Sequence, residues 1–147
     1  MLPIDPEIQI KSTIKPGSIF LFADDDYLNS TPHYYVVLNH NPLKDTVLLL
    51  VCAVTLDGNV FCNIDNSPYP RETYVDVTPN QCSILRHVSL FDCNRVKERE
   101  LAKLVDKLRE KKLKHIGIIE HDVLKSLRTA SIISPAIEEN IKKLLRG

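Results

Sequence analysis

The stretch TPHYYVVLNHN, residues Thr31 to Asn41, decides the fold of the first part of the chain. Its aromatic and β-branched centre predicts a buried strand over 33–39, and HNPLKDT after it supplies a turn. The run VLLLVCAVT, residues 47–55, then returns as a second buried strand. Its length and its bounding turn signals fit a strand better than a helix.

Shorter segments of the same kind surround this pair. The KPG turn at 15–17 leads into a strand, and Asp57-Gly58 has the composition of a tight hairpin turn. The leader through Ile14 is expected to pack on the outside as an arm. Further strands are expected over 18–22, 73–77 and 88–93, with 60–64 as a segment that can pair. Several short strands without a long crossover favour a curved antiparallel sheet that closes into a small barrel.

The pattern becomes helical after about Asn94. A helix is predicted over about 96–112 with Asn94 as its N-cap, from an apolar stripe formed by Leu101, Leu104, Val105 and Leu108. Gly117 interrupts this region, and a shorter apolar stripe follows within 120–131. A last helix is expected to be capped by Ser134, with Pro135 in its first turn.

The size and composition predict a single domain over residues 1–147. The chain is 44% hydrophobic and 26% charged, which is the balance of an ordinary globular protein. We therefore expect an α+β fold, with a barrel over about 15–94 followed by a helical part over about 95–147. No apolar run approaches the roughly 20 residues of a membrane helix, and the leader lacks a basic segment before an apolar one, so a cytoplasmic protein is expected.

The cysteines predict neither a disulfide framework nor a metal centre. They are far apart, without a C-x-x-C pair or a histidine at zinc-site spacing, at positions Cys52, Cys62, Cys82 and Cys93. We expect reduced structural thiols, no metal and no cofactor. A metal site remains an alternative only where distant ligands converge.

The charges divide unevenly although the net charge is zero. Residues 1–94 hold five basic and eleven acidic side chains, a net of −6, while 95–147 hold fourteen basic and eight acidic, a net of +6. The basic part can form a face for nucleic acid, and its densest run is REKKLKH at 109–115. The interpretation favoured for most of the charge is attraction between an acidic barrel and basic helices, within a subunit or across a dimer.

The order of these segments resembles a known family. KPGSIFLF, PHYYVVLN, VLLLVCAVT and TYVDVTPNQCSILRHVSLFDCNRV follow one another as the strands do in the PemK/MazF-like toxin family. The resemblance spans the first two thirds of the chain. It implies a small SH3-like antiparallel β-barrel, metal-independent endoribonuclease activity on single-stranded RNA, an antitoxin partner and a homodimer.

The resemblance also implies site residues. Family members use an arginine at the start of the second strand and a threonine at the end of the third. Thr55 matches that threonine, whereas Pro32 and His33 stand where the arginine motif would be. Imidazole can exchange a proton at cellular pH, but it gives no permanent bidentate phosphate clamp.

The predicted catalytic set is therefore His33, Thr55 and Arg86. His33 would be the acid or base, Thr55 would position the phosphate, and Arg86 would stabilise its charge. His87 beside Arg86, and Lys15, are candidate substrate-binding residues. The structural alternatives are a histidine that only bonds backbone and an arginine that pairs with a nearby acid. The functional alternatives are a non-catalytic barrel that binds a protein partner or itself, and a nucleic-acid-binding module that uses the basic helices.

Overall fold

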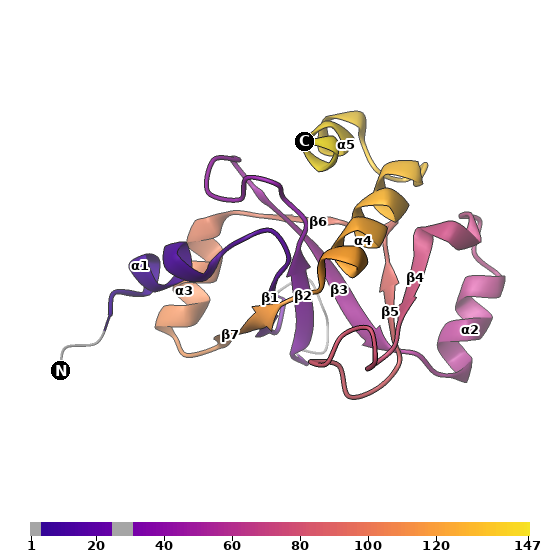
Figure 1. The fold of residues 1–147 in the computed structure, drawn as a ribbon, viewed down its shortest axis with the longest axis horizontal. Coiled ribbons are helices and arrows are strands. Elements are labelled where there is room, and N and C mark those ends of the chain that lie inside the picture. The colour runs from indigo at the N-terminus through magenta and orange to yellow at the C-terminus, as the bar shows by residue number, and fades with distance from the viewer. Residues whose placement is uncertain (1–3, 25–30) are drawn as a thin grey trace.

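A computed structural model describes residues 4–24 and 31–147, apart from the side chains of residues 59, 61 and 62. Within this part the protein is α+β, with a seven-stranded antiparallel sheet and helices on both of its faces (Figure 1). The strands are β1 (Ser18–Phe22), β2 (His33–Val37), β3 (Leu48–Thr55), β4 (Tyr74–Val77), β5 (Ser89–Asp92), β6 (Lys97–Arg99) and β7 (Leu113–Ile118). The helices are α1 (Pro6–Thr13), α2 (Gly58–Asp65), α3 (Leu101–Arg109), α4 (His121–Ile133) and α5 (Glu139–Arg146), with a 3-10 turn η1 at Arg71–Thr73.

The sheet is open, so the expected closure into a barrel is wrong. The strands run in the order β4-β5-β3-β2-β1-β7, and β6 pairs with the first half of β3. Strand β7 adds to β1 as an antiparallel neighbour instead of bringing β1 back to β4. A sheet covered by helices on both faces buries its apolar side chains without closing on itself.

Two separate cores account for the strongly apolar strands. Alternate residues of β2 and β3 point to opposite faces, as the two-residue period requires. The α4/α5 core holds Val36, Val51, Phe91, Leu127, Ile141 and their neighbours on one face. The α1/α3 core holds Ile10, Phe20, Phe22, Tyr35, Leu50 and Leu104 on the other. Helices α4 and α5 lie on one side of the twisted sheet, and α1 and α3 lie on the other (Figure 1).

The loop between β2 and β3 is held by a buried side chain. Asn39 is fully buried; its amide nitrogen donates to Asp45 Oδ2 at 2.9 Å and to the Val47 carbonyl at 2.9 Å. Its amide oxygen accepts from the Leu49 backbone nitrogen at 2.6 Å. Strand β2 therefore ends at Val37, before the expected end at residue 39, because Asn39 turns the chain.

The expected hairpin at Asp57-Gly58 is a helix start instead. Asp57 Oδ1 accepts a hydrogen bond from the Val60 backbone nitrogen at 3.0 Å, which satisfies one of the free amides at the start of α2. The segment 60–64, expected to pair as a strand, lies inside this helix. Asp-Gly thus acts as a helix cap here.

The helical part also differs from expectation at its boundaries. The predicted helix over 96–112 divides into β6 and the shorter α3, whose N-cap is Glu100 and not Asn94. The interruption around Gly117 is strand β7. Ser134 ends α4 and does not begin α5, which starts at Glu139. The second predicted apolar stripe lies within α4.

No described helix is long and apolar enough to cross a membrane.

The KPG turn is confirmed and gives a testable prediction. Ser18 N donates to the Lys15 carbonyl at 3.0 Å, and Gly17 has φ +83°. A Cβ at residue 17 would lie 3.2 Å from Ile119 Cγ2 and 3.3 Å from Leu124 Cδ2. We expect Gly17→Ala to lower the free energy of unfolding by about 1–2 kcal/mol, measured by urea denaturation. Gly58→Ala is the control, since a Cβ there meets nothing within 4 Å, and an equal loss in both variants would contradict the prediction.

Candidate functional site

A hollow at one end of the sheet is lined by four of the five predicted site residues. It has a volume of about 650 Å³, and is termed the Thr55 hollow. Its walls come from the start of β2, the end of β3, the start of β5 and the loops beside them. The lining residues are Leu21, Thr31, Pro32, His33, Tyr34, Ala53, Val54, Thr55, Leu85, Arg86, His87 and Ser89.

The antiparallel register explains why these segments meet. Tyr34 lies opposite Ala53 in the β2–β3 pair, and Thr55 lies opposite Ser89 in the β3–β5 pair. The start of β2, the end of β3 and the start of β5 therefore share one end of the sheet. The Leu56 backbone nitrogen donates to the Val88 carbonyl at 3.0 Å and extends the β3–β5 pairing into the loops.

The two-residue period separates His33 from Thr55 by face. Thr55 follows Val51 and Ala53 on the α4/α5 face, and its partner Ser89 shares that face. His33 pairs with Phe22, which belongs to the α1/α3 core. The two residues border the same hollow, but the strand geometry directs their side chains to opposite faces of the sheet.

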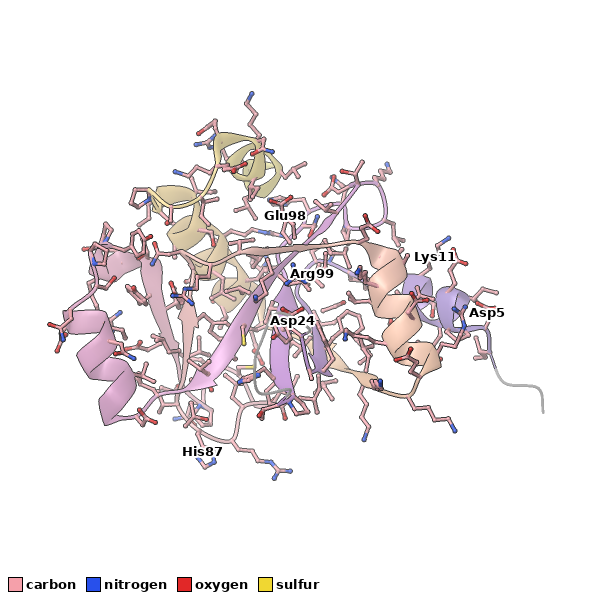
Figure 2. The ribbon with its side chains drawn as sticks, turned by 180° about the vertical axis from the view of Figure 1, so that it is seen from behind. Asp5, Lys11, Asp24, His87, Glu98 and Arg99 are labelled. Carbon is pink, nitrogen blue, oxygen red and sulfur yellow. The ribbon has the colours of Figure 1, made fainter. Side chains whose placement is uncertain are left out.

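Arg86 and His87 are exposed at the mouth of the hollow. Leu85 and Cys82 are buried in the α4/α5 core, and they anchor the loop that leads to β5. Figure 2 shows His87 at the lower edge of the molecule. Within the described part of the chain Arg86 makes no ion pair, so its guanidinium faces solvent as a donor for an anion.

Lys15 lies away from the Thr55 hollow. Lys15 precedes the start of β1, whereas His33 pairs with Phe22 at the other end of that strand. Its charge instead acts on His115, whose pKa is lowered by burial and, to a smaller extent, by the positive charge of Lys15. The structure therefore brings His33, Thr55, Arg86 and His87 to one hollow and leaves Lys15 outside it.

Two polar residues of the hollow were missed by sequence reasoning. Tyr34 neighbours Thr55 on the α4/α5 face, and the Ser89 hydroxyl, directly opposite Thr55, donates to the His87 carbonyl at 3.1 Å. Ser89 could have been found from its place at the start of a strand. In an antiparallel pair, the start of one strand lies beside the end of the strand that it pairs with. Tyr34 carried no signal, because tyrosine is common in buried strands.

The described cysteines and acidic groups outside the hollow give no sign of a metal centre. Within residues 4–24 and 31–147, no three histidine, cysteine or acidic side chains gather as a metal site. Cys82 and Cys93 are buried, and burial raises the pKa of the Cys93 thiol to about 12. Such a thiol stays protonated at cellular pH and is a poor nucleophile.

Comparisons with known proteins found no match, so a function has to be argued from the fold and the Thr55 hollow. No family model matches the chain, and no curated protein matches it significantly.

Proposed function

We propose that this protein is a PemK/MazF-like endoribonuclease that cuts single-stranded RNA without a metal at the Thr55 hollow. The observation that carries the proposal is the meeting of His33, Thr55, Arg86 and His87 in one hollow. The proposal includes a cytoplasmic location, an antitoxin partner and a homodimer. Light scattering during size exclusion tests the homodimer, and a strictly monomeric protein rules it out.

The reaction needs a base, an acid and groups that bind the phosphate, and the histidines, Arg86 and Thr55 are the candidates for these roles in the hollow. A base removes the proton of the ribose 2′-hydroxyl, whose oxygen attacks the adjacent phosphorus. The bond to the 5′-oxygen breaks, and an acid returns a proton to that oxygen. Arg86 stabilises the charge on the phosphoryl oxygens, and the Thr55 hydroxyl positions the phosphate by a hydrogen bond. Imidazole is the side chain suited to proton transfer at neutral pH.

The choice between the two histidines follows from their orientation. His33 occupies the position that the family resemblance implies for the cationic residue, but its strand position directs it to the α1/α3 face. His87 is exposed beside Arg86 on the loop that borders Thr55. His87 is therefore the better-placed acid or base, and His33 serves as the alternative.

The deciding experiment is cleavage of labelled single-stranded RNA by the purified protein in the presence of EDTA. We expect products with 2′,3′-cyclic phosphate and 5′-hydroxyl ends. Arg86→Ala and His87→Ala should each lower the cleavage rate about 100-fold or more. Thr55→Val, which keeps the shape and removes the hydroxyl, should lower it about tenfold.

Matched controls keep this result specific. Arg95→Ala and His121→Ala remove exposed side chains of the same types outside the hollow, and should cleave at the wild-type rate. Loss of activity in His33→Ala but not in His87→Ala would move the acid or base role to His33. Cleavage that survives Arg86→Ala and Thr55→Val would rule out the Thr55 hollow as the active site.

A non-catalytic binding protein is the second candidate function. The missing strand-2 arginine and the orientation of His33 favour it, since both remove groups that the resemblance implies for catalysis. This candidate predicts that intact RNA or a protein partner binds the wild-type protein and is released without cleavage.

A further inference from the structure

A second hollow, beside α3, is rich in lysine. It has a volume of about 780 Å³ and is lined by Lys103, Lys107, Lys111, Lys112 and Lys114. Two acids, Asp106 and Glu110, also line it, so the five positive and two negative side chains among the described lining residues give a net charge of +3. This hollow is termed the lysine groove.

The acids neutralise only part of the lysine charge. Glu110 pairs with Lys112 at 3.2 Å, and Asp106 pairs with Arg109 at 3.3 Å. In the described residues, Lys103, Lys111 and Lys114 form no ion pair, and all three are exposed. Three ammonium groups therefore face the groove with their charge available to an anion.

The backbone at Lys111 is disfavoured for a residue with a side chain. The Lys111 nitrogen donates to the Leu108 carbonyl at 2.9 Å, and the Lys112 nitrogen donates to the Lys107 carbonyl at 2.7 Å. This pattern ends α3 with a left-handed residue, a position that favours glycine. Lys111 has φ +61°, the only positive φ among the described non-glycine residues. A strained residue that also lines the charged groove suggests that its side chain has a use there.

The lysine groove continues from the Thr55 hollow. Leu21 and Pro32 line both hollows, so the groove begins at the wall of the proposed active site. The two hollows therefore adjoin at this wall, and a polymer bound at Thr55 would have to cross only Leu21 and Pro32 to meet the lysines of α3. Continuity with the hollow favours the same RNA strand over an unrelated acidic protein.

We propose that the lysine groove binds the phosphate backbone of single-stranded RNA that flanks the nucleotide held in the Thr55 hollow. The inference rests on the proposed function, because it takes RNA as the ligand of that hollow. Lysine ammonium groups contact phosphates as point charges and read no base. The groove therefore adds affinity without adding sequence preference.

The test measures binding of a fluorescein-labelled 2′-O-methyl oligouridylate, which cannot be cleaved, by fluorescence anisotropy between about 50 and 200 mM salt. Each phosphate contact on a single strand contributes about 0.7 to the slope of log affinity against log salt. The triple variant Lys103→Gln, Lys111→Gln and Lys114→Gln should therefore reduce the slope by about 2 and weaken binding at least tenfold at low salt. The control Lys44→Gln, Lys142→Gln and Lys143→Gln removes the same charge away from both hollows and should bind as the wild type.

Lys111→Gly separates a binding role from a structural one. Glycine suits the left-handed backbone, so this variant should melt about 2–4 °C higher than the wild type. It should nevertheless bind the oligouridylate roughly threefold more weakly at low salt, because one phosphate contact is lost. A more stable variant with unchanged RNA affinity would assign Lys111 no part in binding and count against the groove.

The outcomes distinguish this inference from the proposed nuclease. Lysine-dependent binding by a protein that does not cut RNA supports the groove and defeats the nuclease. Cleavage with a salt slope unchanged in the triple variant overturns the groove and leaves the nuclease in place. Poly-L-glutamate serves as a second probe, for an acidic protein. If the triple variant loses binding to poly-L-glutamate but binds RNA as the wild type does, the groove is a surface for acidic protein and the proposal is overturned.

Discussion

Replacing Asp24 by alanine is expected to lower the free energy of unfolding by about 3–5 kcal/mol. The Asp24 side chain is only 3% exposed, and it accepts from Arg99 Nε at 3.0 Å and Arg99 Nη2 at 2.8 Å. Lys97 Nζ lies 3.3 Å from the same carboxylate. Figure 2 shows Asp24 beside Arg99, where the segment that follows β1 meets β6. Removing the carboxylate takes a negative charge away from Arg99 and Lys97, whose side chains are both largely buried.

Asp76→Ala is the matched control for Asp24→Ala. Asp76 also receives two hydrogen bonds from one arginine, Arg71 Nη2, at 3.2 and 3.0 Å, but this pair is exposed. Exposed ion pairs contribute at most about 1 kcal/mol. Urea denaturation of both variants should show a loss at least threefold larger for Asp24. Equal losses would mean that the Asp24 cluster contributes no more than a surface pair.

The same cluster predicts a dependence on pH. Burial acts to raise the pKa of the Asp24 carboxyl, but the hydrogen bonds and charges of Arg99 and Lys97 outweigh burial and hold that pKa below its usual value. A lowered folded-state pKa stabilises the protein above the unfolded value of about 3.9, and this stability is lost as pH falls through the folded value. The stability difference between the wild type and Asp24→Asn should therefore be constant near neutral pH and shrink below about pH 4.

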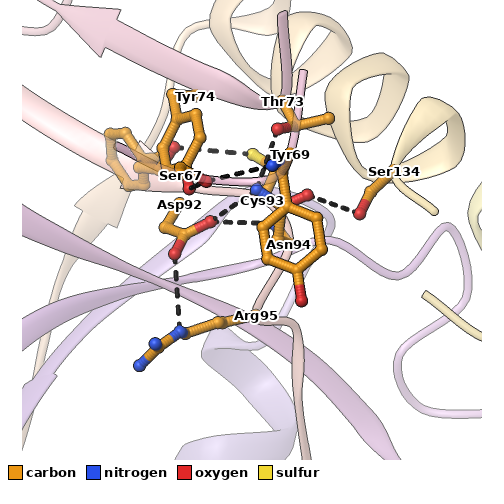
Figure 3. Close-up of polar contacts among 10 residues, drawn as sticks. Ser67, Tyr69, Thr73, Tyr74, Asp92, Cys93, Asn94, Arg95 and Ser134 are labelled. Carbon is orange, nitrogen blue, oxygen red and sulfur yellow. Dashed lines mark hydrogen bonds and ion pairs between the residues drawn. The ribbon is translucent and has the colours of Figure 1, made fainter. Parts of the chain in front are cut away.

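The second large effect is expected for Asn94→Ala, with a loss of about 3 kcal/mol. Asn94 is nearly buried, and Figure 3 shows its side chain at the centre of a polar network. Its amide nitrogen donates to Thr73 Oγ1 at 2.8 Å and to Asp92 Oδ1 at 3.0 Å. Its amide oxygen accepts from Ser134 Oγ at 2.6 Å. Alanine would leave two buried hydroxyls, of Thr73 and Ser134, and the partly exposed Asp92 carboxylate without this partner, and each buried group costs about 1–3 kcal/mol before relaxation.

Two further substitutions make the Asn94 prediction specific. Asn140→Ala removes an exposed amide in α5 and should change stability by less than about 0.5 kcal/mol. Thr73→Val removes one member of the network and should cost about 1 kcal/mol. Urea denaturation of the three variants measures the order. An Asn94→Ala loss no larger than that of Thr73→Val would show that the network acts through a single bond.

The sheet strands up to β5 were predictable because their local signals agree. The runs at 18–22, 47–55, 73–77 and 88–93 are β-branched or aromatic and are bounded by turn residues, and each contains an observed strand. The Asp57-Gly58 pair failed as a hairpin signal because the same two residues also suit a helix start. The hydrogen bond from the Val60 amide to Asp57 belongs to the helix start, and that contact is not visible in the composition.

Strand β7 could not be predicted from its own residues. Its sequence LKHIGI exposes Ile116 and Ile118 and contains a glycine, so neither a buried nor an alternating pattern marks it. What makes it a strand is pairing with β1, where Ile118 lies opposite Ser18. Local pattern reasoning has no access to a partner that distant in the chain.

The candidate site was predictable in its location and not in its orientation. Antiparallel strand order alone places Thr55 and the Arg86-His87 loop at one end of the sheet. The run HYYVV is apolar or aromatic at every position after His33, because the two cores take alternate residues. A two-residue period therefore gave no indication of which face His33 would join.

The distant pairing of β1 with β7 has a consequence for synthesis of the protein. Ser18 leaves the ribosome well before Ile118, its partner in the finished sheet, has been translated. During that interval the outer edge of β1 has main-chain amides and carbonyls without their final partner, and such an edge can pair with other chains. We therefore expect nascent molecules to be more prone to aggregation than the finished protein until translation reaches β7.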